Sequence, residues 1–327
     1  MKAWQVHELG EPRDVLKLDD VAEPEPAAGQ VKVKVLAAPA NFPDVLLCRG
    51  EYQVKPPLPF TPGVELCGEV VAVGAGVTRA AVGDRVVGNP ILPGGAFAEY
   101  AVLPQESTFA APSALDDAEA SALTIGYQTA WFALHRRTQI REGDYLLVHA
   151  AAGGVGSAAV QLGKAAGATV IGVVGGPAKA KYAQDLGADL VIDRHSEDFV
   201  PIVKEFTKGH GADIVFDPVG GDAYNGSTKC IAFEGRIVII GFAGGTIPRP
   251  ALNHALIKNY SIVGLHWGLY HAKGPQVIDE CHVELTRLAD KGLVKPLISE
   301  RLPLTEVADG IGRLGDGSTV GRVVFQP

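Results

Sequence analysis

The stretch DYLLVHAAAGGVGSAAVQLGKAAG, residues 144–167, decides the fold of the larger part of this chain. It opens with an apolar run over 144–149, continues into closely spaced glycines and then becomes rich in alanine over 156–166. A short apolar run before a glycine turn is typical of a buried strand, and small residues let a helix lie close to a sheet. The stretch therefore predicts a strand, a tight turn and a helix.

The same alternation continues toward the C-terminus. The segment from Lys179 to Leu186 has helical character and ends at Gly187, the residue type that most often closes a helix. Strands that alternate with helices build a parallel sheet, and right-handed crossovers make it doubly wound. We expect its strands at 144–149, 169–174, 190–192, 213–217 and 236–241.

Residues 1–124 have a different character, with short strand-like runs and prolines between 56 and 62 that exclude a helix there. This part predicts an irregular β domain. The C-terminal segment predicts a helix near 275–291 and a final strand at 321–325, and we expect it to return to the first domain. The predicted domains are 1–124 with 265–327, and 125–264.

The glycine turn matches the pattern G-x-G-x-x-G, with Ala151 in the first glycine place, then Gly153 and Gly156, and with Gly154 and Val155 between them. Such glycines let the backbone approach a pyrophosphate, which lies at the N-terminus of the following helix. A plain tight turn explains an isolated glycine pattern equally well. Here the flanking strand, the helix and the later βαβ units favour a dinucleotide site.

The end of the second predicted strand indicates which dinucleotide is bound. An NAD site usually has an acidic residue there that holds the ribose hydroxyl, but this chain has Gly175. Lys179 and Arg194 follow nearby. Each of them could be an ordinary solvated residue. Two cations without an acid suit a 2′-phosphate, so the pattern favours NADP(H) over NAD(H).

Composition and charge exclude several classes of protein. The formal net charge of −8 and the scattered basic residues argue against nucleic-acid binding. The 19 uncharged residues between Asp144 and Lys164 reach the length of a membrane span, but the glycines divide them into two short groups. Four widely spaced cysteines and the lack of an apolar signal core in the first residues lead us to expect a reducing, cytoplasmic location.

Several blocks in a fixed order extend over essentially the whole chain. They are NFPD (41–44), RGEY (49–52), PGVE (62–65), VGDRV (82–86), GAFAEY (95–100), QTA (128–130), AAGGVG (151–156) and FDPVG (216–220). With these blocks the chain resembles the zinc-independent quinone oxidoreductase (zeta-crystallin-like) branch of the medium-chain dehydrogenase/reductase superfamily. The resemblance implies an α/β protein with a GroES-like β-barrel domain, a doubly wound Rossmann domain and an active site in the cleft.

The resemblance also bears on metal binding. Zinc-dependent relatives place a cysteine near position 41 and a histidine at 64, where this chain has Asn41 and Val64, and they carry a cluster of four cysteines that is absent here. Catalytic zinc needs three protein ligands. The remaining Cys48, Glu65 and Cys67 do not form a plausible set, and we interpret Glu65 as a buried structural acid. We expect no metal site.

Without zinc, another group must stabilise the oxygen that gains charge during reduction. We predict Asn41 and Tyr52 as catalytic residues, since a neutral phenol donates both a hydrogen bond and a proton. Tyr52 could instead only line the pocket. Asp44 is expected to organise its loop. By resemblance, a further set contacts the cofactor: Asn41, Thr129, Gly241, Phe242, Ala243, Leu265, Trp267 and Arg322. Wall packing by Trp267 and a surface position of Arg322 are open alternatives.

The predicted function is NADPH-dependent reduction of quinones or α,β-unsaturated carbonyls, with a small-molecule substrate and no nucleic acid or membrane as partner. An enoyl-CoA or other enoyl-thioester reductase is the nearest alternative, and a non-catalytic NADPH-binding protein is a second. By resemblance we expect a homodimer that pairs the strands at 261–264, because an apolar sheet edge invites pairing.

Overall fold

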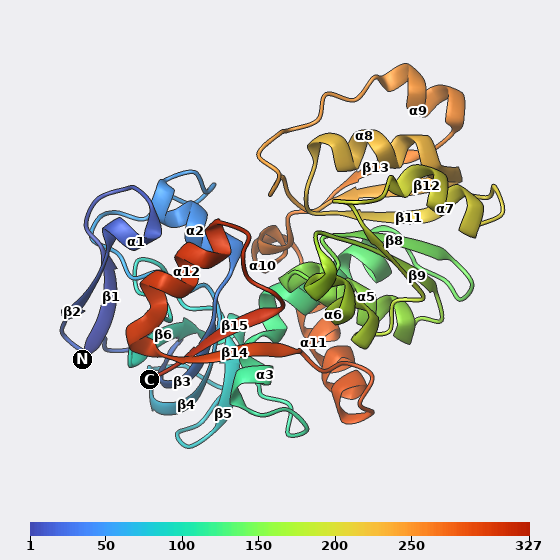
Figure 1. The fold of residues 1–327 in the computed structure, drawn as a ribbon. Coiled ribbons are helices and arrows are strands. Elements are labelled where there is room, and N and C mark those ends of the chain that lie inside the picture. The colour runs from blue at the N-terminus through green and yellow to red at the C-terminus, as the bar shows by residue number, and fades with distance from the viewer. The chain divides into compact units, whose positions relative to one another are not determined.

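The computed structural model describes residues 1–327, which form two compact units (Figure 1). The first comprises Met1–Ile125 and Lys295–Pro327, and the second comprises Gly126–Val294. The segment 265–294, which the sequence analysis assigned to the first domain, groups with the second unit, where the helix at 275–290 packs against the helix at 128–131. None of the helices combines the length and the apolar character needed to cross a membrane.

The first unit is built on an almost entirely antiparallel sheet. Its strand order is β14-β15-β3-β4-β5-β7, and β6 pairs with the free stretch of β3. A separate two-stranded sheet pairs β1 with β2. The strands are β1 (Lys2–Val6), β2 (Leu16–Asp20), β3 (Gln30–Pro39), β4 (Leu66–Val73), β5 (Arg85–Gly88), β6 (Tyr100–Pro104), β7 (Thr108–Ala110), β14 (Ile298–Pro303) and β15 (Arg322–Gln326).

Within this unit, the C-terminal segment packs against the N-terminal part of the chain. The indole nitrogen of Trp4 donates to the carbonyl of Leu304 at 2.6 Å. The rings of Phe97 and Phe325, both fully buried, meet edge to face with centroids 5.4 Å apart. These contacts give a core shared by both parts of the unit. The helices of this unit are α1 (Pro12–Val15), α2 (Phe42–Arg49), α3 (Asp117–Ser121) and α12 (Val307–Gly315).

The second unit is a six-stranded, all-parallel sheet in the order β10-β9-β8-β11-β12-β13. The order reverses between β8 and β11, and in such sheets ligands bind at the carboxyl ends of the strands beside this point. The strands are β8 (Tyr145–His149), β9 (Thr169–Val174), β10 (Leu190–Asp193), β11 (Ala212–Asp217), β12 (Ile231–Ile239) and β13 (Ser261–Gly264).

Helices cover both faces of this sheet. Figure 1 shows α5 and α6 together, with α7 and α8 on the opposite side. Two π-helical segments, Leu123–Tyr127 and Phe132–Arg137, flank α4. The helices are α4 (Gln128–Trp131), α5 (Gly154–Ala165), α6 (Pro177–Asp185), α7 (Phe199–Phe206), α8 (Gly221–Cys230), α9 (Leu252–Lys258), α10 (Tyr270–Lys273) and α11 (Pro275–Asp290).

The expected doubly wound sheet is confirmed, while several local details differ. Helix α2 lies in the part expected to be irregular β structure, and its first turn is closed by the Asp44 carboxylate, which accepts from the backbone nitrogen of Asn41 at 2.9 Å. Strand β12 begins at Ile231, five residues before the prediction. The left-handed backbone of Glu234 (φ 58°) bends it, which obscures a continuous strand pattern in the sequence.

Candidate functional site

The glycine loop after β8 is shaped for close approach of a ligand. The backbone of Ala150 is left-handed, and its carbonyl accepts from the nitrogen of Gly153 at 2.8 Å. A Cβ on Gly156 would lie 2.1 Å from that carbonyl oxygen, so only glycine fits there. Helix α5 begins at Gly154, so its unpaired backbone N–H groups face the loop. This is the cradle that a pyrophosphate requires.

The expected loop residues occupy two kinds of position. Ala151 is fully buried and its nitrogen donates to the carbonyl of Val173 at 3.1 Å, so it joins β8 to β9. Gly153, Gly154 and Val155 are partly exposed at the start of α5. Ala151 therefore holds the loop in place, while the other three form its accessible surface.

The three residues predicted to select NADP(H) meet at the carboxyl ends of β9 and β10. A Cβ on Gly175 would lie 3.3 Å from Nε of Arg194, and the Arg194 nitrogen donates to the carbonyl of Val174 at 3.0 Å. Burial lowers the pKa of Lys179, and the positive charge of Arg194 lowers it further, so both cations belong to one cluster.

The segments predicted to pass beside the nicotinamide also lie in this unit. The nitrogen of Ala243 donates to Pro218 and that of Leu265 to Ile239, so each segment is tied to a strand end or the loop after it. Phe242, between Gly241 and Ala243, keeps 38% of its surface exposed.

Gln128 is a residue that the sequence analysis missed. Its Oε1 accepts from the indole nitrogen of Trp267 at 3.1 Å, and its side chain is fully buried beside Thr129. The Nε2 of Gln128 has no hydrogen-bond partner in the structure. Gln128 thus joins two predicted cofactor residues, and only the block QTA at 128–130 pointed to it in the sequence.

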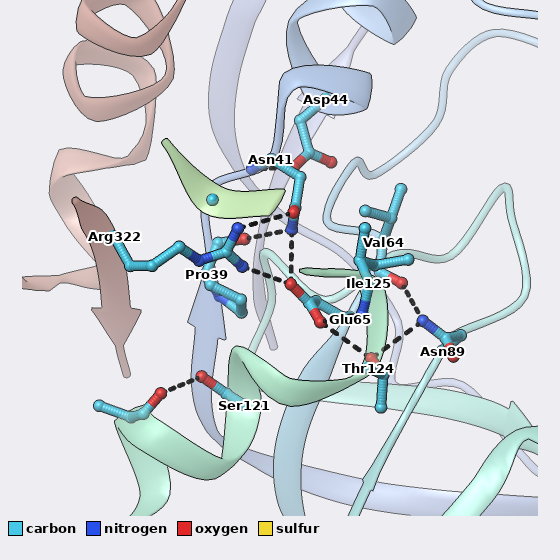
Figure 2. Close-up of polar contacts among 12 residues, drawn as sticks. Pro39, Asn41, Asp44, Val64, Glu65, Asn89, Ser121, Thr124, Ile125 and Arg322 are labelled. Atoms are coloured by element: carbon cyan, nitrogen blue, oxygen red, sulfur yellow. Dashed lines mark hydrogen bonds and ion pairs between the residues drawn. The ribbon is translucent and has the colours of Figure 1, made fainter. Parts of the chain in front are cut away.

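A second set of polar side chains lies in the first unit (Figure 2). Glu65 is fully buried and accepts four hydrogen bonds: from the Asn41 amide at 2.9 Å, from the Thr124 hydroxyl at 2.9 Å, from the Ile125 nitrogen at 2.7 Å and from Arg322 at 2.5 Å. The interpretation of Glu65 as a buried structural acid agrees with this geometry.

Asn41 is fully engaged in this network. Its Nδ2 donates both to Glu65 and to the carbonyl of Pro39 at 3.2 Å, and its Oδ1 accepts from Arg322 at 3.1 Å. An amide nitrogen has two hydrogens. Asn41 therefore has no amide hydrogen left to donate to a substrate oxygen. The catalytic roles that remain for it are to accept a hydrogen bond or to position its neighbours.

Arg322 is buried, in contrast to the surface position considered for it in the sequence. Its side chain is 5% exposed and forms an ion pair with Glu65 in the first unit (Figure 2). The tail brings the arginine here because β15 pairs with β3, which leads directly to Asn41. Contact of Arg322 with a cofactor stays a prediction.

Tyr52 and Asp44 have contrasting surroundings. The Tyr52 hydroxyl has no hydrogen bond within the chain, and burial, with the negative charge of Asp44, raises its pKa, so the phenol keeps its proton at neutral pH. Burial also raises the pKa of Asp44 to about 7. Asp44 accepts from the backbone nitrogens of Asn41 and Gly63, both at 2.9 Å, which confirms that it organises its loop.

Comparison with known proteins agrees with this architecture. Residues 27–113 match the alcohol dehydrogenase GroES-like domain, and residues 154–282 match the zinc-binding dehydrogenase domain. The chain is 39% identical, over 99% of its length and 88% of the relative, to the quinone oxidoreductase-like protein 2 homolog of Nematostella vectensis. The chain belongs to the quinone oxidoreductase branch of the medium-chain dehydrogenase/reductase superfamily. It is therefore an oxidoreductase with a GroES-like and a Rossmann domain; closure of the first sheet into a barrel stays a prediction.

Two further relatives are informative for this oxidoreductase. A mycobacterial protein whose structure was solved in complex with NADPH is 31% identical, with a TM-score of 0.91 and 100% of both chains covered. The phthioceranic/hydroxyphthioceranic acid synthase of Mycobacterium tuberculosis contains a segment, 14% of its length, that is 33% identical over 92% of this chain.

Proposed function

We propose that this oxidoreductase reduces quinones or α,β-unsaturated carbonyls with NADPH and without zinc. The observation that carries the proposal is the buried ion pair between Arg322 and Glu65. The guanidinium already neutralises the carboxylate and donates to the oxygen of Asn41, so a divalent ion placed among these groups would meet a positive charge. No group of three or more His, Cys, Asp or Glu side chains in residues 1–327 has the arrangement of a metal site.

NADP(H) fits the second unit. The Ala150–Gly156 loop and the start of α5 would hold the pyrophosphate, since Gly156 leaves room that any other residue would fill. Lys179 and Arg194 would hold the 2′-phosphate beside Gly175, where no acid competes. The NADPH complex of the mycobacterial relative supports this choice. Bound NADPH supplies a hydride, and the protein supplies position and polarity.

Tyr52 is our candidate for the proton donor. Its phenol has no internal partner, and its raised pKa keeps it protonated. Val54 and Leu58 are 52% and 45% exposed on the same loop, an apolar surface suited to a quinone or enone. We propose that the Tyr52 hydroxyl donates to the substrate oxygen as negative charge develops on it.

The test follows NADPH oxidation with phenanthrenequinone, a cyclic enone and crotonyl-CoA. Turnover of a quinone or enone with kcat lowered at least tenfold in Tyr52→Phe, and little changed in the control Tyr100→Phe, is the expected result. Tight NADPH binding without turnover on any substrate would point to a non-catalytic protein and overturn the proposal.

An enoyl-thioester reductase is the second candidate. It is favoured by the 33% identity to a segment of a mycobacterial acid synthase. Faster turnover of crotonyl-CoA than of any quinone or enone, lost specifically in Tyr52→Phe, would select it over our first proposal.

We also propose a homodimer formed along β13, the outermost strand of the parallel sheet. Helix α9 buries none of its residues, and Leu252, Leu256 and Ile257 are 73–78% exposed beside this edge. Large apolar side chains gathered at an open sheet edge are typical of an interface. A dimer in sedimentation at micromolar concentration is expected, and a monomer there would refute it.

The four cysteines are free and buried, which supports a reducing, cytoplasmic location.

A further inference from the structure

The loop after β10 brings a histidine to the cluster described above. A Cβ on Gly175 would lie 3.1 Å from Nε2 of His195, closer than the 3.3 Å that separates it from Nε of Arg194. The imidazole and the guanidinium therefore both lie against Gly175, whose lack of a side chain lets them approach the backbone closely. The sequence pattern did not indicate His195, because the residue lies beyond the strand end and has no fixed spacing from the glycine loop.

The orientation of this loop is fixed by Asp193. Its Oδ1 accepts from the backbone nitrogens of Gly176 at 2.8 Å and His195 at 3.1 Å, which joins the loops after β9 and β10. These backbone hydrogen bonds lower the pKa of Asp193, so it is ionised at neutral pH. Nδ1 of His195 lies 4.0 Å from the same carboxylate, while Nε2 faces Gly175. The carboxylate thus lies on the Nδ1 side of the ring, and Nε2 is directed toward Gly175.

We propose that His195 is a third residue that binds the 2′-phosphate of NADP(H), with Lys179 and Arg194, and that its protonation sets the affinity for the phosphorylated cofactor. This inference rests on the NADP(H) site proposed above. An imidazolium donates a charge-assisted hydrogen bond to a phosphate oxygen, and imidazole is the side chain that ordinarily changes charge between about pH 5 and 8. The preference for NADP(H) over NAD(H) would therefore depend in part on pH.

The other charged groups around the site agree with an anion at its centre. Burial lowers the pKa of Lys179, and the positive charge of Arg194 lowers it further, so these two cations repel one another. On the acidic side, Asp193 is engaged with backbone nitrogens, and Glu197 accepts from the Asp193 nitrogen at 3.1 Å. Lys181, also on α6, is paired with Asp185. A phosphate bound here would add negative charge beside Arg194 and Lys179.

The test measures binding of NADP⁺ and NAD⁺ by isothermal titration calorimetry, with the wild type and His195→Gln. At about pH 6 the substitution should weaken NADP⁺ binding about tenfold, and at about pH 8 only two- to threefold, because imidazole side chains ordinarily lose their charge between these values. NAD⁺ binding should be unchanged. The 2′-phosphate itself ionises near pH 6, so the inference is judged on the difference between the two proteins at each pH.

Proton linkage gives an independent readout. Near pH 7, NADP⁺ binding to the wild type should take up protons, seen as a heat that depends on the ionisation enthalpy of the buffer, since a phosphate favours the imidazolium. Loss of a proton by the phosphate on binding would have the opposite sign. His195→Gln should abolish the uptake. His210→Gln, which removes another half-exposed histidine paired with an aspartate, should retain it.

The possible results distinguish the role of His195 from the proposed NADP(H) site on which it rests. Equal NADP⁺ affinity and equal proton uptake in the wild type and His195→Gln would overturn the role of His195. If Arg194→Ala and Lys179→Ala still weaken NADP⁺ but not NAD⁺ binding, the proposed 2′-phosphate site stands without the histidine. If none of the three substitutions changes NADP⁺ affinity, the proposed site is wrong and the inference with it.

Discussion

Replacing Arg322 by methionine should destabilise the first unit by about 3 kcal/mol. Glu65 is fully buried and Arg322 is 5% exposed, so the substitution leaves a carboxylate charge without its partner. Breaking such a buried pair typically costs roughly 3–5 kcal/mol. The lower end applies because the Asn41 amide, the Thr124 hydroxyl and the Ile125 nitrogen continue to donate to Glu65.

Differential scanning calorimetry measures this effect. A loss of about 3 kcal/mol corresponds to a fall in Tm of roughly 6–12 °C for a unit of this size. The matched control is Arg301→Met, which removes an arginine from an ion pair with Asp116 whose side chains are 44% and 48% exposed. Surface pairs contribute at most about 1 kcal/mol, so its Tm should fall by less than about 4 °C.

A double variant tests the reason for the effect. In Glu65→Gln with Arg322→Met no unpaired charge is buried, so the loss of stability should be clearly smaller than the sum of the two single losses. Arg322→Met matching Arg301→Met in Tm, or strictly additive single effects in the double variant, would refute the reasoning.

Three further outcomes are expected. The pKa of Asp44 is raised to about 7 in the folded protein, so the native state keeps a proton that the unfolded state loses. The protein should therefore lose stability as the pH rises from about 4 to 7. Asp44→Asn should flatten this decline in thermal scans between pH 5 and 8, and a pH profile parallel to that of the wild type would contradict the assignment. Gly175→Asp would place a carboxylate against Arg194 and His195, and should lower NADP⁺ affinity by tenfold or more while NAD⁺ binding holds or improves in calorimetry. Gly156→Ala should abolish binding of both dinucleotides, since its Cβ would meet the carbonyl of Ala150; retained affinity would show that the loop shifts at little cost.

Local sequence patterns predicted the parallel sheet because each of its strands, turns and helices is formed by consecutive residues with a recognisable pattern. The apolar run at 144–149, the glycines after it and the small residues of α5 each require the conformation that they adopt, and Gly156 has no alternative beside Ala150. The same locality underlies the prediction that Gly175 marks the cofactor preference, since strand ends and the residues after them can be read in order.

Two elements of the fold were missed or misplaced in the sequence. Helix α2 has local signals that were not recognised: Asn41 and Asp44 form a capping box at its start, and the left-handed Gly50 ends it. The same Asp44 carboxylate also accepts from the distant nitrogen of Gly63. The start of strand β12 was placed too late because Glu234 has a left-handed backbone, which cannot be recognised from a non-glycine residue in the sequence.

The sequence by itself determined which residue types are present and which are missing, including the glycine loop, the absence of an acid at 175 and the loss of zinc-ligand types at 41 and 64. Only the tertiary structure decided what those residues do. Arg322 is 257 residues from Glu65 in sequence, and β15 must pair with β3 before the two charges meet. His195 faces Gly175 only because two strand ends lie side by side. Charge pairing acts through space, so the partners of a buried charge are fixed by folding and not by spacing along the chain.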